Sequence, residues 1–188
     1  MSDPLWADLL NSDWHDHLGS GRREERLEND AWLSAFLARM AWKGPLPSAR
    51  ERGRLRRLRV LLCRIVEAVR AGGRVDAKDI ALLNGALAES PLARRIERTR
   101  GGWSITTAPV SGGIDGVVAE LASSFASMLA DGDPSRIRIC ANRDCNWVFY
   151  DWSRNRTRRW CNAAECGNLI KVRRFRERHR ARRKLPVR

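Results

Sequence analysis

The sequence predicts a mainly helical N-terminal domain of the α+β class with one small β-hairpin, followed by a small C-terminal module that ends in a basic helix. Three observations support this fold class. Apolar residues recur at helical spacing through the first 130 residues, two alternating runs flank Gly101-Gly102, and four of the five cysteines lie within residues 140–166. A chain of 188 residues holds one ordinary domain and one small module, which we place at 1–133 and 136–188.

The first two long helices have clear start and stop signals. A helix that Asn29 or Asp30 caps should run to about Trp42, with apolar residues at i, i+3, i+4 and i+7. A longer helix follows Ser48, which forms a capping box with Glu51, and ends at Gly72-Gly73. Both helices should bury one apolar face in the domain core.

The rest of this domain follows from the same patterns. A helix over 76–88 should have Ile80 on its inward face. Residues 92–98 and 103–107 alternate between polar and apolar side chains, which predicts a hairpin with one solvent-exposed face. A last amphipathic helix runs over 114–130.

The compartment follows from what the chain lacks. No apolar run approaches the roughly 20 residues of a membrane span, and the N-terminus lacks the order of a signal peptide. We therefore expect a cytoplasmic protein with no membrane partner. In that compartment, paired cysteines are more often metal ligands than disulfides. Cys63 lies beside the apolar stripe of a helix and is interpreted as a small core residue.

The remaining four cysteines form two pairs with regular spacing, Cys-x4-Cys, fifteen residues, then Cys-x4-Cys. Four thiolates form a closed tetrahedron around zinc and leave no open position for water, which favours one structural zinc ion over a catalytic one. Two disulfides or four unrelated thiols are the alternatives. The predicted ligands are Cys140, Cys145, Cys161 and Cys166.

Inside the module we expect a knuckle at the first cysteine pair, a strand over 147–150 that turns back into a return strand at 158–160, and then a helix from the second pair. Val172 and Phe175 are three residues apart and could anchor this helix on the module.

The positive charge of the chain is concentrated on this module. The net charge is +14, and residues 136–188 hold 17 Lys and Arg against 4 Asp and Glu, whereas residues 1–135 hold 19 against 18. A near-neutral body with a cationic end indicates a polyanionic partner at that end. Like charges repel along a helix over 167–184, so phosphates are the natural partner.

We therefore interpret the protein as a regulator that binds DNA through this helix. DNA is favoured over RNA because the module shows no evident aromatic platform for stacking bases; Trp152 is the one candidate. The alternative is an adaptor that binds RNA or an acidic protein without sequence-specific DNA recognition. The predicted nucleic-acid contacts are Arg154, Arg158, Arg159, Lys171, Arg173, Arg174, Arg176, Arg178 and Arg180.

The sequence contains no pattern typical of an enzyme. It has no Ser/His/Asp set, no glycine-rich phosphate loop and no HExxH stretch, and His15-Asp16-His17 is the only cluster that could support an activity. The N-terminal domain is instead expected to sense a small-molecule effector or to form a homodimer. Five of its tryptophans could line an effector pocket, although core packing is the favoured explanation for them.

A set of C-terminal residues also matches a known family pattern. These residues are Arg138-Ile139-Cys140, Cys145, Phe149, Asp151, Ser153-Arg154-Asn155, Arg158-Arg159-Trp160-Cys161, Cys166-Gly167-Asn168, Lys171 and Arg173-Arg174. With them, the segment 136–180 resembles the CGNR zinc finger, which implies a treble-clef-like order of zinc knuckle, hairpin and basic helix. Leu169 stands where the family signature has arginine, so one phosphate anchor could be missing.

The N-terminal half resembles, more distantly, the ABATE domain that accompanies this finger. The matching residues are Asp8-Leu9-Leu10-Asn11-Ser12, the arginine-rich helix after Ser48, and Asp79-Ile80-Ala81-Leu82-Leu83-Asn84. Family members are bacterial and are described as stress-induced regulators of transcription. The resemblance implies a cytoplasmic, nucleoid-associated regulator.

Overall fold

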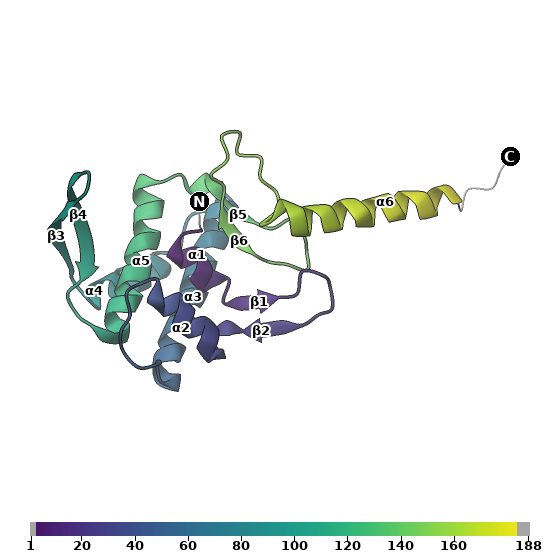
Figure 1. Cartoon of the computed structure of the whole chain (residues 1–188). Helices are drawn as coiled ribbons and strands as arrows, with labels where there is room; N and C mark the ends of the chain where they lie inside the picture. The colour runs from purple at the N-terminus through teal and green to yellow at the C-terminus, as the bar shows by residue number, and fades with distance from the viewer. Residues whose placement is uncertain (1–2, 184–188) are drawn as a thin grey trace.

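The computed structural model describes residues 3–183 and contains six α-helices and three two-stranded antiparallel sheets within that range (Figure 1). The helices are α1 (Leu5–Leu10), α2 (Asp30–Ala38), α3 (Ala49–Arg70), α4 (Ala77–Ala88), α5 (Gly113–Asp131) and α6 (Asn168–Arg183). The strand pairs are β1 (Asp13–His15) with β2 (Arg23–Glu25), β3 (Leu92–Thr99) with β4 (Gly102–Pro109), and β5 (Ile137–Ile139) with β6 (Val148–Tyr150). Shorter turns are η1 (Arg26–Glu28), η2 (Pro134–Arg136) and the π-helical turn η3 (Ala163–Gly167). The predicted fold class is confirmed.

The core of the N-terminal domain lies between α1, α3, α4 and α5. The α3 helix begins with the predicted capping box of Ser48 and Glu51. Trp6 of α1 packs edge-on against Phe125 of α5, with ring centroids 5.4 Å apart, and both side chains are fully buried. The α2 helix starts at the predicted cap, Asn29, but ends before Trp42, since Ala41 adopts a left-handed backbone with φ 54°.

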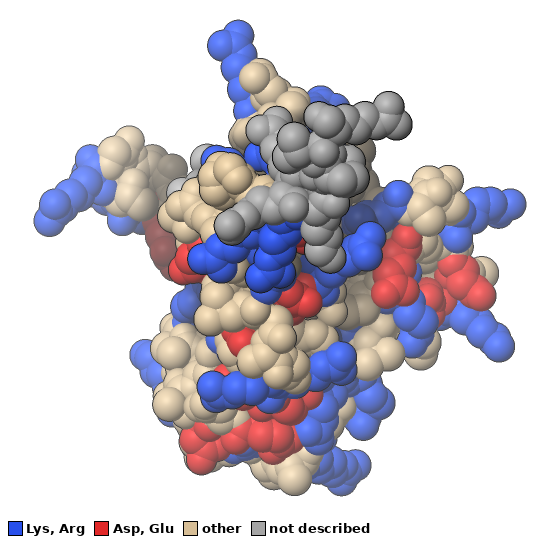
Figure 2. Space-filling view, turned by 90° about the vertical axis from the view of Figure 1, so that its right-hand side faces the viewer, with Lys and Arg blue, Asp and Glu red and all other residues tan. Residues whose placement is uncertain are grey.

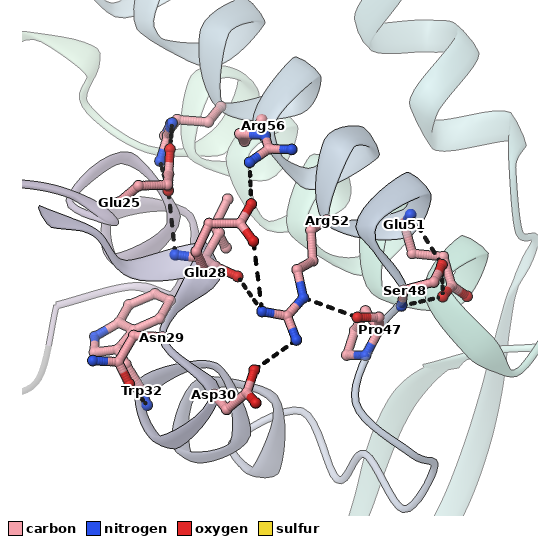
Figure 3. Close-up of polar contacts among 12 residues, drawn as sticks. Glu25, Glu28, Asn29, Asp30, Trp32, Pro47, Ser48, Glu51, Arg52 and Arg56 are labelled. Carbon is pink, nitrogen blue, oxygen red and sulfur yellow. Dashed lines mark hydrogen bonds and ion pairs between the residues drawn. The ribbon is translucent and has the colours of Figure 1, made fainter.

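The arginines of α3 bind the segment that precedes and begins α2 (Figure 3). Arg52 donates to the Asp30 carboxylate at 2.7 Å and to the Pro47 carbonyl at 2.9 Å. Arg56 pairs with Glu28. These charged side chains lie off the apolar stripe of α3, so they fix its N-terminal half against η1 and α2 without entering the core.

Two surface expectations for this domain are wrong. Ile80 of α4 is 39% exposed and not inward. The predicted β3–β4 hairpin forms, with Ile96 opposite Ile105, yet both side chains are more than 60% exposed (68% and 67%). The hairpin lies at the side of the molecule opposite α6, where α5 contacts β4, and no described element covers the apolar face of the ribbon (Figure 1).

The α5 helix qualifies the expectation about membrane spans. Its 19 residues are long and apolar enough to cross a membrane by length and composition. However, Val117, Leu121 and Phe125 are buried against α1, α3 and α4. A central core helix needs the same composition.

The C-terminal module shares the core of the N-terminal domain. Ile137, Val148 and Tyr150 of the β5–β6 sheet are buried in the same apolar cluster as α1 and α3. Beside them, the amide of Asn11 acts as a partner for β6. Its Nδ2 donates to the Val148 carbonyl at 2.8 Å, and its Oδ1 accepts from the Val148 N–H at 2.7 Å.

Candidate metal centre

The β5–β6 sheet positions the first cysteine pair. Cys140 directly follows β5, and Cys145 lies in the turn that leads back to β6. The Cys140 N–H donates to the Trp147 carbonyl at 2.8 Å, and the Cys145 N–H donates to the Asn142 carbonyl at 3.0 Å. These bonds close the predicted knuckle.

The predicted strand pairing within the module is wrong. Residues 148–150 pair with β5, which precedes the knuckle, and not with residues 158–160, which form no strand. The reason is that β5 occupies one edge of β6 and the Asn11 amide occupies backbone groups on the other. Residues 158–160 still meet the knuckle, because the Ala141 N–H donates to the Arg159 carbonyl at 2.9 Å.

The second cysteine pair lies on η3, which leads directly into α6. Asn162 caps this turn by accepting the Ala164 N–H at 2.9 Å. Cys161 lies just before the cap, and Cys166 is buried on the last part of the turn. The helix that carries the basic residues therefore starts at the metal site, as predicted.

The four sulfur atoms form one cluster. All four lie within 4.8 Å of one another, with 3.6 Å from Cys145 to Cys161 and 3.7 Å from Cys161 to Cys166. Sulfurs bound at about 2.3 Å to a tetrahedral zinc ion lie about 3.8 Å apart. The observed spacing and the all-thiol donor set are therefore compatible with one zinc ion.

The ionisation of the four thiols also favours a bound cation. Contacts with the Cys145 and Cys161 thiols lower the pKa of Cys140 to about 2. The contact with Cys140 raises the pKa of Cys145 to about 12, and Cys140 and Cys145 together raise the pKa of Cys161. One thiolate therefore suppresses ionisation of its neighbours. A divalent ion at the centre removes this repulsion and stabilises four thiolates together.

Cys63 plays no part in the cluster. It packs partly buried against the main core, and burial raises the pKa of its thiol to about 11. At neutral pH it is therefore protonated and a poor ligand or nucleophile.

Buried polar side chains hold the loop between the two cysteine pairs. Asp151 is fully buried and accepts the backbone N–H groups of Ser153 at 2.9 Å and of Arg158 at 3.0 Å. Burial raises the pKa of Asp151, but these hydrogen bonds outweigh it and leave the pKa below its usual value. Arg136 donates to the carbonyls of Asp151 and Ser153, at 2.9 and 3.0 Å.

Two of the predicted nucleic-acid contacts are used inside the protein. Arg158 lies 4.3 Å from the Phe149 ring centroid and donates to the carbonyls of Trp160 and Cys161, so it positions a metal ligand. Arg173 donates to the Asp144 carboxylate and to the Leu18 carbonyl, both at 2.6 Å.

The other predicted contacts lie on the surface. On the loop and on α6 the exposed side chains are Arg154, Arg159, Lys171, Arg174, Arg176, Arg178 and Arg180. The predicted anchors of α6 are exposed as well, 45% for Val172 and 55% for Phe175, so that expectation is wrong. Lys184, the predicted end of the helix, lies outside the described residues. Leu169 is partly buried on the first turn of α6.

The sequence did not reveal the residues that orient the ligands. Asn142 is 1% exposed, and its amide donates to the Cys166 sulfur at 3.6 Å and to the His17 carbonyl at 2.8 Å. Asn11 and Asp151 are similarly buried and hydrogen-bonded. A buried polar residue resembles an exposed one in sequence, and only the position of Asn142 between two cysteines gave a signal.

The fold and the cysteine cluster define a class of protein, in which a mainly helical domain carries a small zinc finger. Comparison with family models agrees with this class. The model of the ABATE family, described as a putative stress-induced transcription regulator, matches residues 3–132, and that of the CGNR zinc finger matches residues 136–179. The chain therefore belongs to the ABATE family and carries a CGNR zinc finger. No curated protein matches the sequence.

Proposed function

We propose that the protein is a zinc-dependent transcription regulator that binds duplex DNA through α6. The observation that carries this proposal is the geometry of α6, which starts at the sulfur cluster and extends away from the body (Figure 1). Figure 2 shows basic side chains spread over the face toward which this helix points, with a patch of acidic ones in its lower part. The family description supports a role in transcription.

The spacing of the basic residues supports contact with a groove and its phosphates. Lys171, Arg174 and Arg178 are three and four residues apart and share one face of α6. Arg176 and Arg180 share another. Like charges at i and i+4 destabilise an isolated helix, and bound phosphates would relieve this repulsion. A helix of this width fits the major groove of B-DNA, where arginine can bind guanine in a bidentate way.

Charge reversal on one face of α6 tests the proposal. The double variant Arg174→Glu, Arg178→Glu should retain zinc but lose at least tenfold in affinity for duplex DNA. The slope of log K against log salt should fall by about 2, since two phosphate contacts are lost. The control is Arg70→Glu, Arg74→Glu, which makes the same change of charge at exposed positions of the N-terminal domain. Equal losses in both variants would show a nonspecific effect of net charge and would refute the assignment to α6.

The second candidate is an RNA-binding adaptor, favoured by two exposed aromatic side chains near the basic residues. Trp152 is 49% exposed beside Tyr150, and Phe175 is 55% exposed on α6. Bases of single-stranded RNA could stack on them. Competition between duplex DNA and single-stranded RNA at two salt concentrations separates the candidates. RNA binding would also depend on the Trp152 side chain, and duplex binding would not.

The proposal assigns the chain no catalytic role and places it in the cytoplasm, at the nucleoid if its source is a bacterium. An effector of the N-terminal domain and a homodimer are part of the same proposal. A dimer would present two α6 helices to the two halves of a palindromic site.

A further inference from the structure

The loop between β1 and β2, residues 16–22, lies against the zinc knuckle and the start of α6. Arg173 of α6 donates through Nη2 to the Leu18 carbonyl of this loop and through Nη1 to the Asp144 carboxylate of the knuckle, both at 2.6 Å. Among residues 168–180 of α6, whose side chains the structure describes, Arg173 is the only one with a side chain that hydrogen-bonds to a residue outside the helix. The N-terminal domain thus supplies half of the polar anchor of the helix.

The same loop is tied to the metal ligands. Asn142 places one amide N–H on the His17 carbonyl and the other on the Cys166 sulfur, so this side chain bridges the loop and the cluster. Next to it, Asn146 and His15 approach at 3.2 Å through their side-chain nitrogens. A displacement of the loop would therefore shift the side chains that hold the first turns of α6.

Gly19 allows the loop to come this close. Its backbone is left-handed, with φ +87°, and a Cβ at this position would lie 2.9 Å from the Asp144 carboxylate and 3.1 Å from Arg173 Nη2. Any side chain at this position would therefore meet the Arg173–Asp144 pair. Gly21 in the same loop has a similar φ of +78°, but a Cβ there meets nothing within 4 Å.

We propose that the β1–β2 loop of the N-terminal domain is a positioning element that sets the direction in which α6 leaves the zinc finger, with Arg173 as its latch. Beyond the first turn, where Leu169 and Ile170 are partly buried, apolar anchoring of the helix is weak, because Val172 and Phe175 are exposed. A 16-residue helix is about 24 Å long, so a tilt of about 10° at its base moves its far end by about 4 Å. A shift of that size would remove several arginines from their phosphates.

The DNA-binding consequence of this latch rests on the proposed function, whereas the orientation of α6 can be measured without DNA. Ketone-bearing unnatural amino acids at positions 70 and 177 accept spin labels without reaction at the cysteines. Double electron–electron resonance then gives the distance between the label on α3 and the label on α6. In the Gly19→Ala variant we expect the distance distribution to broaden and shift, and zinc content to stay at one per chain. Gly21→Ala, with similar backbone strain but no contact, should match the wild type.

A second variant keeps the positioning role testable should Gly19→Ala fold poorly. Arg173→Lys retains the charge but cannot hold Leu18 and Asp144 at once with a planar fork. It should change the distance distribution like Gly19→Ala and weaken DNA binding by about tenfold while the salt slope stays near that of the wild type. If the Arg173→Lys variant kept the full DNA affinity of the wild type, Arg173 would be a simple phosphate contact and not a positioning residue.

The two measurements separate failure of the latch from failure of the proposed function. An unchanged distance distribution in both Gly19→Ala and Arg173→Lys would overturn the latch. A changed distribution with unchanged DNA affinity would support the latch and would contradict the proposed contact between α6 and DNA.

Discussion

Asn11 makes a testable link between the N-terminal core and the zinc finger. This side chain is 4% exposed, and its amide forms two hydrogen bonds with the backbone of Val148, one to the carbonyl at 2.8 Å and one from the N–H at 2.7 Å. Asn11→Ala would leave both Val148 groups without a partner in a site too buried for water to replace the amide freely. Each buried, unsatisfied group costs about 1–3 kcal/mol, so we expect a loss of about 3 kcal/mol in the free energy of unfolding.

The assay is urea unfolding of the zinc-loaded protein, followed by tryptophan fluorescence. The m-value should stay constant, because the change removes hydrogen bonds and little buried area. Asn29→Ala is the matched control. Asn29 caps α2 with a bond of 3.1 Å to the Trp32 N–H at an exposed site, and loss of such a cap costs about 1 kcal/mol.

The comparison between the two asparagines decides the outcome. If Asn11→Ala costs no more than Asn29→Ala, then the Val148 groups find other partners, and the finger does not depend on this contact. A drop in m-value with a small loss would instead indicate that the finger detaches while the core stays folded.

Three further predictions concern the zinc finger and the ion pair between Glu25 of β2 and Arg59 of α3. Removing zinc with a chelator should cost the finger on the order of 10 kcal/mol and unfold it, so that hydrogen exchange becomes fast over 137–167 and stays slow in α3. Asp151→Ala should cost about 2 kcal/mol in urea unfolding, because the N–H groups of Ser153 and Arg158 lose their acceptor. Burial raises the pKa of Glu25, but its bonds with Arg59 outweigh this and leave the pKa below its usual value. The ionised Glu25 side chain should therefore stabilise the fold above the unfolded pKa of about 4.3, and this stabilisation should be lost as pH falls through the folded pKa. Urea unfolding at pH 7 and pH 3.5 measures this pH dependence, which the Glu25→Gln variant should lack.

The elements that the sequence predicted well depend on contacts within a few residues. The capping box of Ser48 and Glu51 forms within one turn of α3, so spacing alone identifies it. The cysteine pairs are equally local, because each Cys-x4-Cys pair folds on its own turn. The chemistry of thiolates then requires the two pairs to meet.

The failures concern partners that are far apart along the chain. The sequence identifies Arg173 as a cation, but the carbonyl that it binds belongs to Leu18, 155 residues away. The strand over 148–150 was recognised, yet its partner was not, because hydrophobic pattern does not specify which edge is paired. The exposed face of the β3–β4 hairpin was misjudged for a different reason, since alternation implies a covering element without showing that one exists.

These long-range hydrogen bonds separate the zinc ligands of the finger from the contacts that fix its orientation. All four ligands lie between 140 and 166, so the metal site takes no ligand from the rest of the chain. Its orientation does, because Asn11 holds β6, the His17 carbonyl holds Asn142, and the Leu18 carbonyl holds Arg173. A finger expressed alone should therefore bind zinc yet lose the fixed direction of α6. Any event that moves the β1–β2 loop would then redirect α6 while all four metal ligands stay in place, and under the proposed function it would also alter DNA binding.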